Sequence, residues 1–278
     1  MEHREGEFKG RGGVRIWYQV WRPEAPKAVV ALAHGLGEHS GRYRNVVDWL
    51  VPRGYAIYAL DHRGHGRSGG RRGHLDRFSD YLDDLQQCIG LAAEQEPGRP
   101  LFLLGHSLGG IIALAYAIER PQGLRGVIAS SPGLRRRFDV PPLKLFLGNL
   151  MSRIWPAFTQ RSGLPASGLS HDPQVALDYL GDKLVHDLVS ARLFSEITKA
   201  GDGVLAHAGD LHLPCLLLQG ADDPIVDPQG TREFYDRAGS ADKTLHLYPG
   251  FYHEGFNEVG KERPLGDLSA WLDAHLDA

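Results

Sequence analysis

The segment Gly105-His106-Ser107-Leu108-Gly109-Gly110 lies between a short apolar run, Leu101 to Leu104, and a longer apolar stretch of helical pattern, residues 108–119. A G-x-S-x-G pattern between a strand and a helix holds its serine on a sharp turn above the end of a sheet. The glycines leave room for the strained backbone and for close packing of strand against helix. The helix that follows also directs backbone N–H groups toward negative charge that forms near the serine. The segment therefore predicts a nucleophile elbow with Ser107 as the nucleophile.

Short apolar runs on both sides of this segment are typical of strands buried in a parallel sheet. They lie at residues 29–32, 55–60, 101–104, 126–129, 215–218 and 244–247. Helix patterns alternate with them at about 43–51, 79–92, 108–119, 229–238 and 263–275, the second with Ser79 as its expected N-cap. This alternation predicts an α/β fold, with a mostly parallel central sheet flanked by helices on both faces. Residues 14–21 precede it and indicate an alternating, antiparallel edge strand.

Between Pro132 and about Leu213 the alternation stops, and helix-like stretches at 143–154 and 173–199 take its place. A structureless loop of that length would be out of proportion inside a compact domain. We therefore expect one domain over residues 1–278, with a mainly helical cap inserted at about 132–213 over the carboxyl edge of the sheet.

Composition narrows the class of protein further. The 278 residues are 42% hydrophobic and 23% charged, as in an average globular domain, and a formal net charge of −3 leaves no basic excess for phosphates. We therefore expect no nucleic-acid partner. The longest apolar stretch, residues 108–118, is too short to span a bilayer, and residues 1–10 lack the apolar core of a secretory signal. Cys88 and Cys215 stand alone, which fits small buried side chains in a reducing cytoplasm.

Acyl transfer at Ser107 requires a base, an acid that orients the base, and donors for an oxyanion. Asp223, with the neighbouring acids Asp222 and Asp227, comes just after one expected strand, and His253 comes just after the next. Ligand sites in open α/β sheets lie at the carboxyl ends of the strands, so we expect these side chains to meet Ser107 in one crevice. The chain order Ser, Asp, His is that of α/β-hydrolases.

The neighbouring residues narrow the choice of the acid and of the oxyanion donors. Pro224 biases Asp223 toward extended backbone at the turn, which favours Asp223 over its two acidic neighbours. The donors are expected to be the backbone N–H of Leu108 and a second N–H from the loop 34–39, because its glycines let the backbone approach a substrate closely.

Four segments of the chain resemble the monoacylglycerol lipases and the related lysophospholipase-like α/β-hydrolases: residues 34–43, 61–68, 105–110 and 248–258. The resemblance covers nearly the whole chain and is weakest in the cap. It implies the α/β-hydrolase fold, with Ser107 as nucleophile, Asp223 as acid, His253 as base, and the backbone N–H groups of Leu36 and Leu108 as the oxyanion hole. Glu38 and Arg42 match the family pattern and are candidate substrate contacts. Phe256 departs from it, since the animal monoacylglycerol lipases carry a histidine three positions after the base.

The predicted function is hydrolysis of a carboxylic ester of a small lipid-like substrate through an acyl-enzyme, with monoacylglycerol as first choice and lysophospholipid as second. A small-ester carboxylesterase and a serine aminopeptidase use the same triad, and both stay open because fold does not fix substrate. A non-catalytic binding module would not require all three triad positions to be filled. No metal or organic cofactor is expected, and the sequence does not indicate an oligomeric state.

The cap carries the least explicit signal. Apolar residues between 143 and 158 exceed what one helical stripe can bury, and packing inside the cap and lining of an acyl tunnel both remain open. Leu147 and Leu150 are the tunnel candidates. The same excess could bring the cap into transient contact with a membrane surface, so a peripheral membrane location is a further expectation. The basic run 135–137 could meet anionic head groups, although a solvated turn is its commoner meaning.

Two further patterns suggest other ligands. Residues 64–69 satisfy G-x-G-x-x-G after a strand, but loop residues follow where a dinucleotide site requires a helix. Histidines at 34, 39, 62, 65 and 74 lie close in sequence, yet neither HExxH nor carboxylates at ligand spacing accompany them. We expect turns and hydrogen-bonded rings at these positions.

Overall fold

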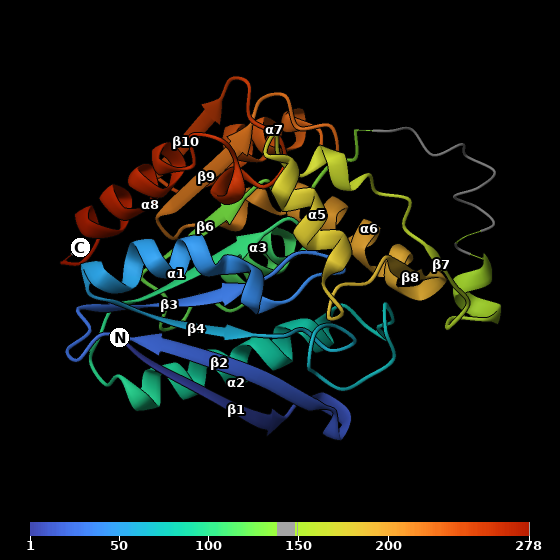
Figure 1. The fold of residues 1–278 in the computed structure, drawn as a ribbon, viewed down its shortest axis with the longest axis horizontal. Helices are drawn as coiled ribbons and strands as arrows, with labels where there is room; N and C mark the ends of the chain where they lie inside the picture. The colour runs from blue at the N-terminus through green and yellow to red at the C-terminus, as the bar shows by residue number, and fades with distance from the viewer. Residues whose placement is uncertain (138–147, 149, 278) are drawn as a thin grey trace.

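An eight-stranded sheet forms the centre of the molecule (Figure 1). The computed structural model describes residues 1–137, 148 and 150–277. The strand order is β1-β2-β4-β3-β5-β6-β9-β10, and the strands from β4 to β10 in that order run parallel. The strands of this sheet are β1 Glu2–Lys9, β2 Arg15–Arg22, β3 Ala28–Ala33, β4 Tyr55–Leu60, β5 Leu101–His106, β6 Gly126–Ser130, β9 Cys215–Gly220 and β10 Lys243–Tyr248. The mostly parallel sheet expected from the apolar runs is confirmed.

The outermost strand at the β1 side of the sheet differs from the expectation. The strand expected at 14–21 is present as β2, but β2 pairs antiparallel with both β1 and β4 and therefore is not the edge. The edge is β1, a charged segment that the search for apolar runs did not identify as a strand. Most of its side chains are exposed. Charged side chains on an edge strand discourage pairing with another sheet, so the same charges that hide the strand in the sequence suit its position.

Helices cover both faces of the sheet (Figure 1). One face carries α1 Arg44–Leu50 and α8 Glu262–Ala274, and the other carries α2 Ser79–Gln95, α3 Leu108–Glu119 and α7 Pro228–Arg237. Every residue of β3, β4, β5, β6 and β9 is buried, as covering on both faces requires. The expected cap at Ser79 is wrong by one position. The N-cap of α2 is Phe78, one position before Ser79. The N–H of Phe78 donates to Glu196 Oε2 at 3.0 Å, so a carboxylate from the insertion between β6 and β9 binds the start of this helix.

The described part of the chain between β6 and β9 lies at the end of the sheet toward which β3 and β4 point (Figure 1). It contains β7 Thr159–Arg161, α5 Pro173–Gly181, β8 Leu188–Ser190 and α6 Ala191–Ala206. Contrary to expectation, this insertion contains strands, since β7 and β8 pair antiparallel. The helix expected over 173–199 is two helices, with Asp172 and Ser190 as N-caps. Strands of three residues are too short to produce a periodic pattern, which explains the error.

Several shorter elements complete the described chain. Of the helix-like stretch 143–154, residues 148 and 150–154 are helical, while 143–147 and 149 lie outside the described residues. Short 3₁₀ turns occur at Arg11–Gly13, Ser40–Tyr43, Val51–Arg53, Ala166–Gly168, Ala208–Asp210 and Gly255–Asn257. In the described part of the chain, no helix combines the length and the apolar character needed to cross a membrane. The division into one domain with a cap stays a prediction.

Candidate active site

Ser107 occupies a strained turn between β5 and α3. Its φ of 54° and ψ of −114° place a non-glycine residue in a sparsely populated region, as a nucleophile elbow requires. A Cβ on Gly109 would lie 2.0 Å from the carbonyl oxygen of Ala33, so only glycine lets α3 pack directly against the end of β3. A Cβ on Gly35 would lie 3.4 Å from the Cβ of Ser107. The loop after β3 is therefore next to the serine.

Asp223 and His253, the expected acid and base, meet at the carboxyl ends of β9 and β10. Asp223 Oδ2 lies 2.7 Å from His253 Nδ1, and both side chains are buried. The same oxygen accepts from Gln219 Nε2 at 3.1 Å, while Oδ1 accepts the N–H groups of Ile225 at 2.8 Å and Val226 at 2.9 Å. Both carboxylate oxygens are thus fully used, and the carboxylate is held in one orientation toward the ring.

This pair shifts the pKa of each partner in the direction that general-base chemistry needs. Burial alone would raise the pKa of Asp223, but the charge and hydrogen bond of His253 and the two backbone N–H groups outweigh it and hold that pKa below its ordinary value. Burial alone would lower the pKa of His253, but the charge and hydrogen bond of Asp223 outweigh it and raise that pKa. Asp223 therefore stays ionised and stabilises the imidazolium.

His253 is placed near Ser107 through its neighbours. Its ring centroid lies 4.8 Å from that of His106, the residue before the nucleophile, and its carbonyl oxygen accepts from Ser131 Oγ at 2.9 Å. Within the described residues the Ser107 side chain makes no hydrogen bond, so a direct contact between Ser107 and His253 belongs to our proposal. Catalytic hydrogen bonds are often long without substrate and tighten when it binds.

The alternative acids have other partners. Asp222 Oδ2 accepts the N–H of Gly250 at 2.9 Å, and Asp227 caps α7 by accepting from the N–H of Gln229 at 3.0 Å. Of these three aspartates, Asp223 alone contacts His253 in the described structure.

The two expected oxyanion donors are unused. Among the described residues, neither the N–H of Leu36 nor that of Leu108 has a protein acceptor. Leu108 is the first residue of α3, where helix geometry leaves N–H groups without intrahelical acceptors. Unpaired backbone donors next to a serine are what an oxyanion hole needs.

Glu38 and Arg42 come together, but their polar atoms are bound to the protein. Glu38 is 4% exposed, and its Oε1 accepts from the N–H of Gly35 and from the Tyr43 hydroxyl, both at 2.6 Å. Its Oε2 accepts from Arg42 Nε at 3.0 Å, and Arg42 also binds Glu254. This arrangement favours a role in holding loops over direct contact with glycerol.

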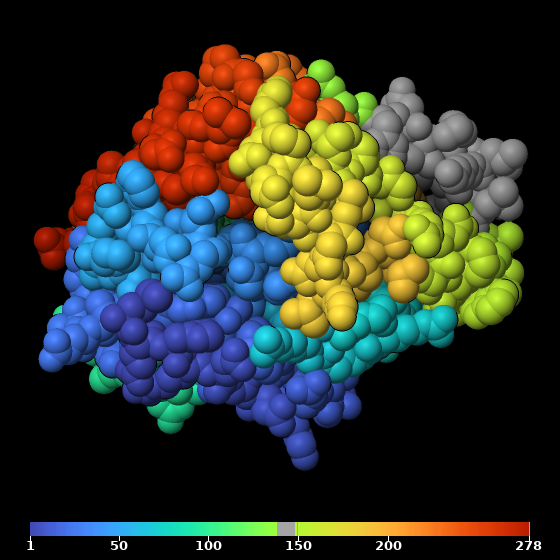
Figure 2. Space-filling model, viewed as in Figure 1, coloured from blue at the N-terminus to red at the C-terminus, as the bar shows by residue number. Residues whose placement is uncertain are grey.

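The described part of the cap contacts the loop 34–39 after β3, which contains the expected oxyanion donor Leu36 and is called the oxyanion loop below. The N–H of His186 donates to the carbonyl oxygen of Gly37 at 2.8 Å, and His39 Nε2 lies 2.8 Å from Asp182 Oδ2. Figure 2 shows α5 and its flanking residues, in yellow, on the surface between the red carboxyl-terminal segments and the cyan loop after β4. Leu150 is 41% exposed, and Leu147 lies outside the described residues.

Three residues near the site escaped the sequence reasoning: His106, Ser131 and Glu254. Ser131 has a φ of 43°, and this second strained serine brings its hydroxyl to the carbonyl of His253. Burial first, and then the charge of His253, lowers the pKa of His106 to about 4, so the ring stays neutral beside the base. Glu254 directly follows the base, and only that adjacency could have drawn attention to it.

Most ring nitrogens of the clustered histidines have hydrogen-bond partners within the protein, while among the described residues the buried His62 Nδ1 and His65 Nε2 have none. His34 Nε2 accepts the N–H of His62 at 2.9 Å, so its Nδ1 carries the proton and donates to the carbonyl oxygen of Gly35 at 2.7 Å. Burial lowers the pKa of His34, His62 and His65, so these rings are neutral. No group of three or more potential ligands in the described chain could hold a metal ion. The 64–69 turn leads into loop residues, without the helix of a dinucleotide site.

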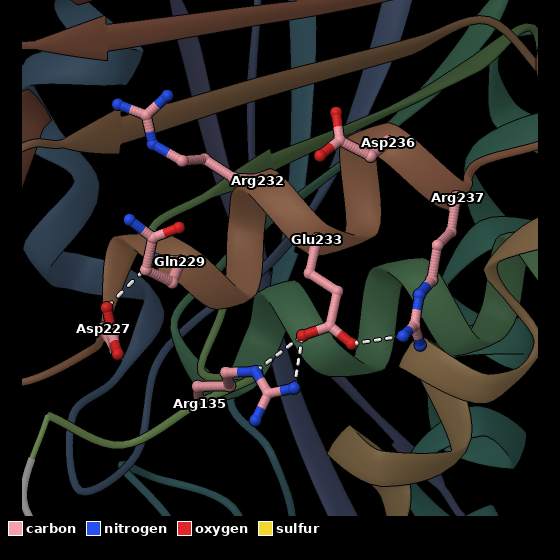
Figure 3. A pocket seen from close by; sticks show the side chains of 7 residues that line it. All are labelled: Arg135, Asp227, Gln229, Arg232, Glu233, Asp236 and Arg237. Atoms are coloured by element: carbon pink, nitrogen blue, oxygen red, sulfur yellow. Dashed lines mark hydrogen bonds and ion pairs between the residues drawn. The ribbon is translucent and has the colours of Figure 1, made fainter.

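A hollow of about 480 Å³ lies beside α7, and none of Ser107, Asp223 and His253 lines it (Figure 3). Arg135 and Arg237 approach Glu233 from two sides, and Arg237 is 2.8 Å from it. Arginine and acidic side chains alternate around this hollow, and surface ion pairs of this kind contribute little to stability. The part of the basic run at Arg135 is therefore engaged in local ion pairing.

Comparison with known proteins decides the family. The model of the family described as "Serine aminopeptidase, S33" matches residues 24–260. A monoacylglycerol lipase of Mycolicibacterium smegmatis is 38% identical over 274 residues, which cover 98% of this chain and 98% of that one. The chain belongs to the monoacylglycerol lipase-like α/β-hydrolases.

Solved structures of this family have the same fold. The crystal structure of the Paleococcus ferrophilus monoacylglycerol lipase is 34% identical, with a TM-score of 0.84 over 99% of this chain and 100% of that one. A soluble variant of the Saccharomyces cerevisiae monoglyceride lipase, in complex with a substrate analog, is 26% identical, with a TM-score of 0.86 over 98% of this chain and 95% of that one. The α/β-hydrolase fold is thus confirmed.

Proposed function

We propose that this carboxylic ester hydrolase acts on monoacylglycerol, releasing a fatty acid and glycerol. The observation that carries the chemistry is the buried contact of 2.7 Å between Asp223 and His253, beside a serine on a strained elbow. The relatives named monoacylglycerol lipase, which match this chain over nearly its whole length, support the substrate.

In the proposed reaction, Ser107 Oγ attacks the ester carbonyl carbon while His253 Nε2 takes the hydroxyl proton. The backbone N–H groups of Leu36 and Leu108 stabilise the oxyanion of the tetrahedral intermediate. His253 then gives the proton to the departing glycerol oxygen, which leaves an ester between Ser107 and the acyl group. Water attacks this acyl-enzyme with His253 again as base, and the fatty acid leaves. Asp223 keeps the Nδ1 proton on the ring and stabilises its cation throughout.

A serine aminopeptidase is the alternative that the family description raises. Such an enzyme needs a carboxylate available to the free amino group of its substrate. Two buried carboxylates lie near the proposed base. Glu38 is in the oxyanion loop, Glu254 is in the loop after β10 that carries His253 (the base loop), and both are bound to Arg42. This commitment favours a substrate whose acyl part has no free amino group, as in a fatty acyl ester.

The cap supports a lipid substrate and contact with a membrane. Ile154, Trp155, Leu177 and Leu180 are large apolar side chains that lie exposed in the described part of the cap. Apolar side chains of this kind can enter the interface of a bilayer. We propose that the cap touches the membrane transiently and that Leu147 and Leu150 contact the acyl chain. A cytoplasmic location stays a prediction from the cysteines.

The test is kcat/KM across an acyl series, from acetyl to long-chain monoacylglycerols, with lysophospholipids, nitrophenyl esters and aminoacyl amides beside it. Each additional buried CH₂ gains about 0.8 kcal/mol, close to fourfold, so kcat/KM rises with chain length until the tunnel is full. A flat or falling series would contradict the lipid substrate and favour a small-ester carboxylesterase. Turnover of the amides alone would favour the aminopeptidase.

A further inference from the structure

Arg42 lies between the two loops that carry the proposed catalytic groups. Its Nε donates to Glu38 Oε2 at 3.0 Å, and its Nη2 donates to both oxygens of Glu254, at 2.8 and 2.7 Å. The Arg42 side chain is 9% exposed, and the ring of Tyr179, from the cap helix α5, is 4.8 Å from its guanidinium carbon. A planar guanidinium with several fixed donors is suited to hold two carboxylates at a set separation.

Each of the two carboxylates is also connected to one half of the proposed site. Glu38 Oε1 accepts the N–H of Gly35 at 2.6 Å, and so fixes the backbone one residue before the Leu36 donor. Glu254 directly follows His253, and its own N–H donates to the carbonyl oxygen of Leu169 at 2.8 Å. Arg42 is therefore the shared partner of the oxyanion loop and the base loop.

Stability alone is a poor reason for this arrangement. One guanidinium faces two buried carboxylates, and burial, only partly opposed by Arg42, raises the pKa of Glu254. Replacing a buried ion network by apolar side chains of similar volume is often neutral or stabilising, so a buried network is weak evidence for a folding role.

We propose that Arg42 is a positioning residue, which sets the placement of the Leu36 N–H relative to the ring of His253 without touching the substrate. The inference rests on the proposed function, because that function gives Leu36 and His253 their roles. A residue that bound glycerol would mainly change KM. A residue that aligns the oxyanion donor and the base mainly changes kcat, because both groups act in the transition state.

The chain offers a matched control in Arg63. Its side chain is also 9% exposed, and it also joins two carboxylates, Asp84 at 2.7 Å and Asp80 at 3.4 Å. Both of these acids belong to α2, so the Arg63 network contacts neither the oxyanion loop nor the base loop. Arg63→Lys therefore reports what loss of a buried fork of this kind does to stability alone.

The experiment compares Arg42→Lys with Arg63→Lys on a nitrophenyl ester and on a monoacylglycerol, and measures Tm for each. Lysine keeps the charge but lacks the planar fork, so we expect both variants to lower Tm and Arg42→Lys alone to lower kcat, about tenfold or more. KM should change by less than about threefold on either ester. A kcat of Arg42→Lys equal to that of Arg63→Lys overturns the inference, as does a loss confined to KM.

Glu254→Gln is the second variant, because it keeps the side-chain shape and decides the matter if Arg42→Lys does not fold. We expect a similar loss of kcat, and an unchanged kcat overturns the inference. The nitrophenyl ester separates the two proposals. A parent that hydrolyses this ester but no monoacylglycerol contradicts the proposed substrate and leaves the comparison of kcat values intact.

Discussion

The carboxyl ends of the parallel strands, called the edge from here on, differ from the cap above them in how their side chains are held. At the edge, Asp223 is fully buried and both of its oxygens have partners, so the atoms that do chemistry have fixed places. In the described part of the cap, Ile154 and Leu180 are 70% and 73% exposed, so few protein contacts hold these apolar side chains. From this difference we infer a division of roles, in which the edge determines the reaction and the cap determines which ester is accepted. A change at the edge should lower turnover of every ester alike, whereas a change in the cap should depend on the acyl chain.

Ser107→Ala should have the largest effect. Removing the nucleophile costs about 10⁴- to 10⁶-fold in kcat, and the loss should be the same for short and long acyl chains, because the serine acts on the carbonyl that all esters share. The measurements are kcat across the acyl series, labelling by a fluorophosphonate, and Tm as the check of folding. Turnover retained by Ser107→Ala with an unlabelled parent Ser107 would rule out the serine mechanism.

Asp223→Asn should have the next largest effect, about 10⁴-fold in kcat on every ester, because the ring of His253 would lose its correct tautomer. Asp222→Asn and Asp227→Asn are the matched controls. In both controls the Asn side-chain oxygen can still accept the same backbone N–H, that of Gly250 for Asp222→Asn and that of Gln229 at the start of α7 for Asp227→Asn, so neither should change stability much. If either control lowered kcat tenfold more than Asp223→Asn did, the acid would be assigned to the wrong residue.

The sequence predicted the edge well because its signals there are local and physically forced. A strand covered on both faces is apolar along most of its length, as β3 is throughout and β9 is except at Gln219, and the turn at Ser107 needs small neighbours. The motifs at the ends of these strands then indicated Asp223 and His253 as candidates for the acid and the base, and the structure brings these two side chains together. Contacts between side chains far apart in the sequence gave no such signal. The bond of Arg42 to Glu254 spans 212 positions, and nothing in either local pattern indicates it.

The cap and the first strand were predicted less well, for two separate reasons. β7 and β8 have three residues each, which is too short for a period-2 pattern to appear. β1 is an edge strand whose charged side chains face solvent, so its hydrogen bonds to β2 define it and hydrophobic alternation does not. In both places the backbone pairs with another segment, and composition carries little information about that partner.

Leu150→Asn should show the opposite behaviour to the edge variants. If Leu150 contacts the acyl chain, a polar side chain removes the burial of about two methylenes, which lowers kcat/KM on long-chain monoacylglycerol about tenfold and leaves a butyryl ester nearly unchanged. Leu177→Asn is the matched control when the monoacylglycerol is supplied in free solution without membranes, because it makes the same substitution at an exposed leucine of α5 that we assign to membrane contact and not to the acyl chain. An equal loss on short and long chains would place Leu150 outside the acyl tunnel and weaken the division between edge and cap.

The pH dependence of kcat/KM should show the smallest effect and the sharpest test of that division. Catalysis needs neutral His253, and Asp223 stabilises its cation and raises its pKa above the ordinary value of about 6.5. The proton is therefore lost at a higher pH, so activity should rise once with pH, through an inflection above 6.5, and fall about tenfold for each unit below it. The inflection belongs to the free enzyme and to the edge, so it should be the same for acetyl and long-chain esters and should not move in Leu150→Asn. An inflection below 6.5 would mean that burial outweighs Asp223 at the ring. One that moved with the acyl chain would mean that the cap reaches the base and that edge and cap do not act separately.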